Sequence, residues 1–353
     1  MTPFRLALVG AGKITAGSHL PAALALPFVE VAAIVDPVAE RAREAAAWFG
    51  RTLPHAARVE DVIGRIDGAL VATPNHTHHA LARTLLEAGV PVLVEKPLTE
   101  TVEDAEELAA LARASGVALV TGYCTRFREG FRIVAEAVKG GMFGPAESFH
   151  HQDGSAGGWA PLDGYRGARG GGGGVIAVTA THFLDRMTQW FGWPEILFYA
   201  DDGEAGPEAN AVADFGFTRP DGSRFTAHAR WSKTAKLGNA TMIRFRDGVM
   251  KVPDGDVPPS FRAHGSGIVH TLAWPDAFAD FVGKTAFERQ IEAFVATVRG
   301  ERPPAVSIEE AVGQVKLVAS LYAARQPLVE DWRAEPATAP RAAEDVAPRA
   351  EAA

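Results

Sequence analysis

The feature that most constrains the fold is a regular alternation of short apolar runs and helical stretches over the first 122 residues. Arg5–Val9 is a short apolar run, typical of a strand buried on both faces. Similar runs follow at Val29–Val35, Ile66–Ala72, Pro91–Val94 and Val117–Val120, with helical stretches between them. Strands that alternate with helices in this way predict a doubly wound parallel sheet.

The first run ends in the glycine turn Gly10-Ala11-Gly12. Gly10 allows a tight turn, and Gly12 lets the backbone approach a pyrophosphate at the start of the next helix. The usual third glycine would fall at Thr15, so the pattern is incomplete. Taken alone, this stretch fits a nucleotide site and a purely structural turn equally well.

Polar residues at the ends of neighbouring strands favour the nucleotide site. Asp36 ends the second run, where a carboxylate can accept hydrogen bonds from both ribose hydroxyls of NAD and would repel the extra phosphate of NADP. Asp36 could instead be the N-cap of a helix over Ala39–Phe49. Thr73–Asn75 and Glu95-Lys96 also follow strands, and ligands bind beyond the carboxyl ends of parallel strands. These strand ends together predict an NAD site.

Composition excludes several classes of protein. The chain has 353 residues, a net charge of −8 and 47% hydrophobic residues, which indicates a globular protein without a basic surface for nucleic acid. No apolar run approaches the roughly 20 residues that span a bilayer. A strand stands where a signal peptide would lie, which favours the cytoplasm. The single cysteine, Cys124, excludes an internal disulfide and is expected to be a small buried hydrophobe.

The second half of the chain has a different pattern. Helices are expected over Phe131–Lys139 and Val175–Trp190, with a strand over Ala146–His151 between them. The glycine-rich stretch Gly154–Gly174 indicates a loop shaped for a ligand or a subunit contact. Further strands are expected at Glu195–Tyr199, Ala209–Phe217, Ser223–Trp231, Thr241–Arg246 and Gly248–Val252.

Antiparallel pairing of these strands is expected, with Asp221-Gly222 and Asp247-Gly248 as hairpin turns. Two more helices are expected, over Phe287–Arg299 and over Ser307–Gln326, the latter capped by Ser307 with Glu310 three residues on. We therefore predict an α/β protein with three regions: an NAD-binding Rossmann domain (1–123), an α/β domain with an open, largely antiparallel sheet (124–333) and a disordered tail (334–353).

The sequence Glu95-Lys96-Pro97 places a lysine at a strand end, followed by a proline. In this feature the chain resembles the glucose–fructose oxidoreductase, inositol dehydrogenase and MocA (Gfo/Idh/MocA) family. The resemblance covers about residues 4–332. Its other matching pieces are Gly10-Ala11-Gly12-Lys13-Ile14, Asp36, Thr73-Pro74-Asn75 with His78, and Gly172-Gly173-Gly174 leading to His182 and Asp185. It implies that the second domain forms the floor of the substrate site and that its open sheet supports dimers or tetramers.

Members of that family mostly oxidise or reduce a carbon that bears a hydroxyl or carbonyl on sugars, inositols and related compounds. The resemblance therefore implies an NAD(H)-dependent oxidoreductase with a sugar-like substrate, with NADP the less favoured cofactor. Two alternatives stay open. One is a hydrolase that uses bound NAD for transient oxidation of its sugar, and the other is a nucleotide-binding regulator without turnover.

A lysine near the nicotinamide can bind the reacting oxygen and stabilise its developing negative charge, which is the role predicted for Lys96. The resemblance implies that His182 is a general acid or base. Glu95 is expected to hold Lys96 or to line the cofactor site. The predicted cofactor contacts are Gly10, Gly12, Lys13, Ile14, Asp36, Thr73, Pro74, Asn75, His78, Glu95 and Lys96. The predicted substrate contacts are Tyr123, Arg126, Tyr165, Arg166 and Asp185, although loop salt bridges would explain Arg166 as well.

No metal site is predicted. His76, His78 and His79 stand at the start of a helix, where their side chains point in different directions, and no cysteine or carboxylate set completes a site. His78 is expected to fix the turn beside the cofactor.

One position departs from the family pattern. Much of the family has an aspartate four residues before the histidine, and this chain has Val178 there. Three accounts are open: Lys96 and His182 suffice, with Asp185 or Thr181 supporting His182; the substrate is more apolar on that side; or the redox activity has been lost. The first two are favoured because Lys96 and the cofactor motifs are intact.

Overall fold

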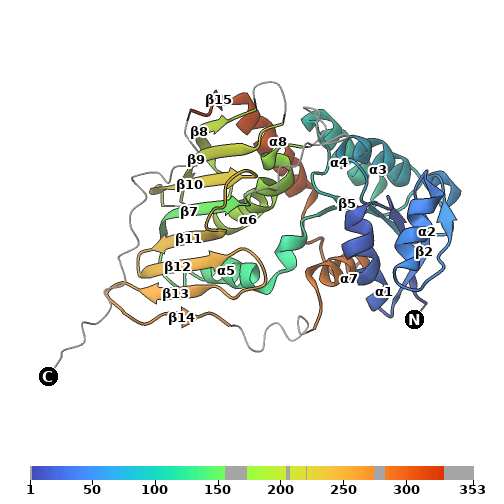
Figure 1. The fold of residues 1–353 in the computed structure, drawn as a ribbon, viewed down its shortest axis with the longest axis horizontal. Helices are drawn as coiled ribbons and strands as arrows, with labels where there is room; N and C mark the ends of the chain where they lie inside the picture. The colour runs from blue at the N-terminus through green and yellow to red at the C-terminus, as the bar shows by residue number, and fades with distance from the viewer. Residues whose placement is uncertain (1, 156–172, 204–206, 220, 274–282, 330–353) are drawn as a thin grey trace.

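The computed structural model describes residues 2–155, 173–203, 207–219, 221–273 and 283–329 of the chain (Figure 1). The chain forms two sheets that lie side by side, each with its own helices. The predicted tail, and the predicted substrate residues Tyr165 and Arg166, lie outside the described residues.

The first sheet has six strands in the order β3-β2-β1-β4-β5-β6, and every neighbouring pair is parallel. Its strands are β1 (Phe4–Val9), β2 (Val29–Val35), β3 (His55–Ala56), β4 (Gly68–Val71), β5 (Val92–Glu95) and β6 (Leu119–Gly122). Both faces of β1 and β4 are buried, which is why these strands have continuous apolar sequences. The predicted doubly wound parallel sheet is confirmed.

Helices cover both faces of this sheet, and two of them come from the far end of the chain. The early helices are α1 (Leu20–Ala25), which follows the π-helix η1 (Thr15–His19), α2 (Ala39–Ala47), α3 (His78–Glu87) and α4 (Val102–Ser115). The late helices are α7 (Ala286–Val298) and α8 (Ile308–Ala323). Phe294 of α7 shares a core with Leu8, and Val315 of α8 shares the other core with Val94. In Figure 1, α7 lies beside α1. The boundary at residue 123 stays a prediction.

The second sheet has nine strands in the order β14-β13-β12-β11-β7-β10-β9-β8-β15. The strands are β7 (Ala146–Gly154), β8 (Glu195–Asp201), β9 (Asn210–Thr218), β10 (Arg224–Ser232), β11 (Ala240–Phe245), β12 (Gly248–Pro253), β13 (Ser260–Ala263), β14 (His270–Thr271) and β15 (Gln326–Pro327). The pairs β7–β10 and β8–β15 are parallel and the others are antiparallel, so the predicted open, largely antiparallel sheet is confirmed.

Helices α5 (Glu129–Lys139) and α6 (Thr181–Phe191) pack on one face of the second sheet. Their apolar side chains, including Phe131 and Phe183, share one core with Phe149 and Trp231 of the strands. Gly192, with a φ of 82°, ends α6 in a conformation that favours glycine. This packing presents the first turn of α6 to the carboxyl ends of the first sheet's strands.

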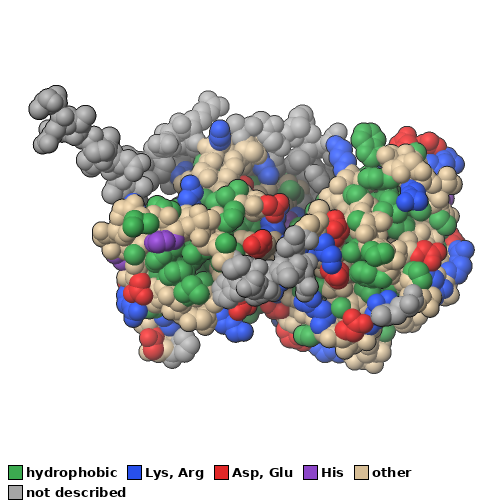
Figure 2. Space-filling view, turned by 90° about the horizontal axis from the view of Figure 1, so that it is seen from below, with side chains coloured by type: hydrophobic (Ala, Val, Ile, Leu, Met, Phe, Trp, Pro, Cys, Tyr) green, Lys and Arg blue, Asp and Glu red, His purple; other side chains and the backbone are tan. Residues whose placement is uncertain are grey.

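None of the helices in the described part of the chain combines the length and the apolarity that a membrane crossing demands. On the face shown in Figure 2, acidic and basic side chains are interspersed.

Candidate active site

The two glycines of the turn after β1 have different surroundings: there is no room for a side chain at Gly10, and there is open space beside Gly12. Gly10 has a φ of 94°, and a Cβ added to it would lie 2.6 Å from the carbonyl oxygen of Ala72. A Cβ added to Gly12 would meet nothing within 4 Å. The helical chain begins at Lys13, directly after this open space. The turn therefore fits the pyrophosphate of a dinucleotide, whose charge the backbone N–H groups of a helix start can bind.

The first helix holds a residue pair that the sequence did not reveal. Its π-helical segment η1 ends at His19, which is buried, and the His19 Nε2 lies 2.8 Å from Glu95 Oε1 at the end of β5. Thr15, in the place of the third glycine, is also fully buried. Segments of π-helix frequently mark functional sites. The η1 segment thus ties the glycine turn to the strand end that carries Lys96.

Asp36 lies at the tip of β2 and faces the glycine turn. One of its carboxylate oxygens accepts a hydrogen bond from the Ala11 N–H (2.9 Å), and the other accepts one from the Val38 N–H (2.8 Å). The N-cap of α2 is Val38, without a side-chain capping bond, so the alternative reading of Asp36 as a helix cap is wrong. The carboxylate therefore links the tip of β2 to the glycine turn.

His78 connects the two turns that follow β4 and β5. Its Nε2 lies 3.0 Å from the carbonyl oxygen of Thr73, and its Nδ1 lies 2.8 Å from that of Pro97. Burial lowers the pKa of His78, although the two carbonyls oppose this effect. Asn75 begins the short helix η3 (Asn75–Thr77) between these contacts. The ring holds the predicted cofactor turn and the Lys96-Pro97 turn together.

The Lys96 side chain extends from the end of β5 in the first sheet to the helical segment that precedes α6. Its Nζ donates to the backbone carbonyl of Val178, 2.9 Å away in the π-helix η6 (Ile176–Ala180). Its own N–H donates to Glu95 Oε2 at 3.1 Å. Burial would raise the pKa of Glu95, but His19 and Lys96 outweigh it and lower that pKa. The Glu95 carboxylate, which His19 holds in place, therefore fixes the position of the Lys96 backbone.

His182 lies one helical turn after Val178, so it faces the same side as the Lys96 contact. Burial, assisted by the charges of Lys96 and Arg186, holds the pKa of His182 well below its usual range, so the ring is neutral near pH 7. Its Nδ1 is buried and has no hydrogen-bond partner among the residues described. The ring of Tyr123 packs edge-on against it, with the ring centres 6.4 Å apart.

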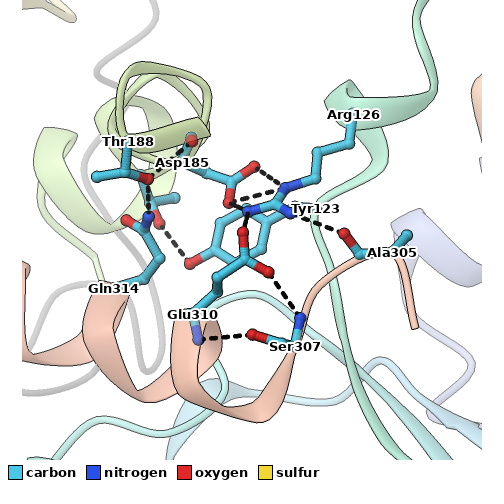
Figure 3. Close-up of polar contacts among 9 residues, drawn as sticks. Tyr123, Arg126, Asp185, Thr188, Ala305, Ser307, Glu310 and Gln314 are labelled. Carbon is cyan, nitrogen blue, oxygen red and sulfur yellow. Dashed lines mark hydrogen bonds and ion pairs between the residues drawn. The ribbon is translucent and has the colours of Figure 1, made fainter. Parts of the chain in front are cut away.

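Asp185 and Thr181 have other partners than His182. Arg126 donates to both oxygens of Asp185, at 2.8 and 2.6 Å, and Asp185 is fully buried (Figure 3). The Arg126 guanidinium also contacts Glu310 at 3.0 Å. Burial alone would lower the pKa of Arg126, but these two carboxylates raise it. Arg126 lies in the short helix Cys124–Phe127 that follows β6, and these contacts join this helix to α6 and α8. The geometry therefore does not support the predicted substrate contacts of Arg126 and Asp185.

Tyr123, the remaining predicted substrate contact of this region, also has a partner within the protein. Tyr123 is buried, and its hydroxyl lies 3.3 Å from Thr181 Oγ1. Thr181 is thus committed to Tyr123, and in the described part of the chain no hydrogen bond joins it to His182. The neighbouring Cys124 thiol is buried, and burial raises its pKa to about 12, as expected for an unreactive thiol.

Known proteins are similar to this chain in sequence. The model of the Gfo/Idh/MocA oxidoreductase family, described as having an NAD-binding Rossmann fold, matches residues 4–123. The chain is 28% identical over 319 residues to the rhizopine catabolism protein MocA of Rhizobium meliloti, a match that covers 90% of this chain and 93% of the relative. It is 35% identical over 149 residues to inositol 2-dehydrogenase 1 of Saccharopolyspora erythraea, covering 41% of this chain and 44% of that protein.

A solved structure shows the same fold over nearly the whole length. KijD10, a 3-ketoreductase from Actinomadura kijaniata in complex with NADP and TDP-benzene, has a TM-score of 0.78 and 22% sequence identity. The match covers 93% of this chain and 99% of that one. The glycine turn, the strand-end residues and these matches lead to one conclusion: residues 4–123 form the NAD-binding Rossmann domain of the Gfo/Idh/MocA family of oxidoreductases.

Proposed function

We propose that this enzyme transfers a hydride between NAD(H) and the hydroxyl or carbonyl carbon of a sugar, cyclitol or related small molecule. The observation that carries the proposal is the contact of the Lys96 Nζ with the Val178 carbonyl beside His182, at the sheet edge that holds the glycine turn. The matched relatives that are named as dehydrogenases and reductases support net redox chemistry over the hydrolase and regulator alternatives.

Different residues of the proposed cofactor site would bind different parts of the dinucleotide. Gly10 and Gly12, with the helix start at Lys13, would seat the pyrophosphate, and Asp36 would bind the ribose hydroxyls and disfavour NADP. Ile14, Thr73, Pro74, Asn75 and Glu95 are the other proposed contacts around this edge, and His78 is proposed to hold it in shape. When bound, the nicotinamide accepts or supplies the hydride.

Lys96 and His182 would manage the substrate oxygen. The Lys96 ammonium donates to the reacting oxygen and stabilises the negative charge that develops on it. The neutral His182 ring accepts the proton of the substrate hydroxyl, and the cations around it favour its onward release. The two groups together cover the tasks of stabilising charge and moving a proton.

Val178 narrows the range of substrates. A backbone carbonyl orients the Lys96 ammonium, as a carboxylate would, but it can neither take nor give a proton. The valine side chain cannot accept a hydrogen bond from a substrate hydroxyl. We therefore favour a substrate that carries a hydrogen or an alkyl group, rather than a hydroxyl, on the side that faces residue 178.

The test is the absorbance of reduced nicotinamide during a screen of sugars, cyclitols and their deoxy forms. Lys96→Met should lower kcat/KM by about 10²–10³-fold, the loss typical of a removed charge-stabilising donor, and should leave the NAD affinity within about a few-fold. Lys316→Met is the matched control, because Lys316 is exposed on α8 and pairs with Glu106. Near-normal turnover by Lys96→Met would refute the assignment. Sugar release without net reduction would indicate the hydrolase, and binding without either would indicate the regulator.

We also propose a homodimer or homotetramer that assembles through the face of the second sheet opposite α5 and α6, and a cytoplasmic location. Leu197 and Met242 are exposed apolar side chains on strands of this sheet. Light scattering of the wild type and of Leu197→Glu would test the assembly. A monomeric wild type would contradict it.

A further inference from the structure

A pocket of about 410 Å³ lies beside the proposed active site, and Tyr123, which packs on His182, is one of its lining residues. We call it the α8 pocket. Pro97, Ala177 and Thr181 line it from one side, and Val318 and Tyr322 of α8 line it from the other. Ala177 and Thr181 follow one line along η6 and α6, whereas Val178 and His182 follow the neighbouring line that faces Lys96. The same helical segment therefore serves both sites with different faces.

The walls of the pocket suit the apolar body of a small molecule. Val315, Val318 and Ala319 of α8 face it together with Ala177 and Pro97. Its volume lies within the range of about 300–1,000 Å³ that is usual for pockets that bind small molecules.

A buried acceptor in the wall lacks a donor. Gln314 lines the pocket and is 1% exposed, and its Oε1 has no hydrogen-bond partner in the described ranges of the chain. The orientation of this amide is settled, because the Thr188 hydroxyl donates to the Asp185 carbonyl and so can only accept from Gln314 Nε2, 2.6 Å away (Figure 3). A buried acceptor without a donor destabilises the protein. A donor from a bound molecule would satisfy it.

The charges at the pocket favour a cation. Glu100 and Glu208 line it, and burial raises the pKa of both. Arg325 also lines it, but its guanidinium pairs with Asp201 at 2.6 Å. Glu208 Oε1 accepts hydrogen bonds from the Ile176 N–H (2.9 Å) and the Tyr322 hydroxyl (3.0 Å), which fix the carboxylate at the pocket wall.

We propose that the α8 pocket binds a small amphipathic amine. The apolar body would lie against α8 and Ala177, and the ammonium would donate to Gln314 and Glu208. An anion of the same shape would meet the carboxylates of Glu100 and Glu208, and the Arg325 guanidinium is already paired with Asp201, so the anion would bind more weakly. This site stands independently of the proposed hydride transfer.

A pair of probes with one ring system and opposite charges tests the proposal. Tryptamine and indole-3-propionate share the indole ring and a side chain of similar length, and isothermal titration calorimetry of the full chain would measure both in the presence of NADH. Tryptamine should bind at one site per chain and about tenfold or more tighter than indole-3-propionate, as one partly buried charge pair allows. Glu208→Gln should reduce this ratio, because it keeps the acceptor for Ile176 and removes the charge.

Two tryptophan variants on α8 form a matched pair. Ala319→Trp fills the pocket from an exposed position and should weaken tryptamine binding about tenfold or more. Ser320→Trp places the same side chain at the next exposed position, which does not line the pocket, and should bind like the wild type. Lys96→Met should also bind tryptamine normally, which separates a failure of this site from a failure of the proposed catalysis. Absence of tryptamine binding, equal binding of the two probes, or normal binding by Ala319→Trp would each overturn the proposal.

Discussion

Alanine substitutions, each of which adds one methyl group, distinguish the roles of the two glycines in the first turn. In Gly10→Ala, the new Cβ would lie 2.6 Å from the carbonyl oxygen of Ala72, and the backbone would have to keep a φ of 94° that alanine disfavours. Backbone strain of this kind costs about 1–3 kcal/mol, and overpacking a tight site costs about as much again. We therefore expect a loss of about 3 kcal/mol in the free energy of unfolding.

Gly12→Ala should behave in the opposite way. Its Cβ meets no protein atom within 4 Å, so stability should change by less than about 1 kcal/mol. The methyl group would instead occupy the space proposed for the pyrophosphate. An overpacking cost of about 1–3 kcal/mol corresponds to a loss of about 10–100-fold in NAD affinity.

Urea unfolding and titration calorimetry with NAD would measure both variants. Gly10→Ala should unfold at a lower urea concentration, and Gly12→Ala should unfold like the wild type and bind NAD weakly. Wild-type stability of Gly10→Ala would show that the clash with Ala72 is not real. Unchanged NAD affinity of Gly12→Ala would remove the pyrophosphate from this turn.

Three further predictions concern charged groups. Asp36→Ser should shift the ratio of kcat/KM for NAD over NADP toward NADP by about tenfold or more, because the repelling carboxylate is gone, and an unchanged ratio would rule out its ribose contact. Asp185→Asn should lower the free energy of unfolding in urea by about 3 kcal/mol, because it weakens a buried ion pair with Arg126; a loss below about 1 kcal/mol would mean that the pair matters little. Because the pKa of Glu95 is lowered in the folded chain, its pairing with His19 stabilises the fold above the ordinary glutamate pKa of 4.5 and loses this effect as the pH falls. The melting temperature of His19→Ala should therefore fall less than that of the wild type between about pH 6 and pH 3.5, and parallel curves would contradict this.

The sequence by itself determined the longer elements and the edge where the predicted cofactor residues meet. The short strands β3, β13, β14 and β15 were not predicted. Strands buried on both faces need continuous apolar runs, so the order of strands and helices in the first half could be predicted from local patterns. The capping box of Ser307 and Glu310 was predicted in the same way, because its two hydrogen bonds span only three residues. Lys96 was found because it directly follows a buried strand.

Only the tertiary structure decided which side chains became partners. His19 meets Glu95 across 76 residues, and Lys96 meets the carbonyl of Val178 across 82, so no local pattern could indicate either contact. The partner of Lys96 is a backbone atom, which every residue type carries and which a sequence therefore cannot mark. Asp185 stands three residues after His182 and was, with Thr181, one of two candidates to support it, yet packing turned it toward Arg126. Local periodicity depends only on residues that are close in the sequence. The pairing of charges depends instead on which elements the folded core brings together.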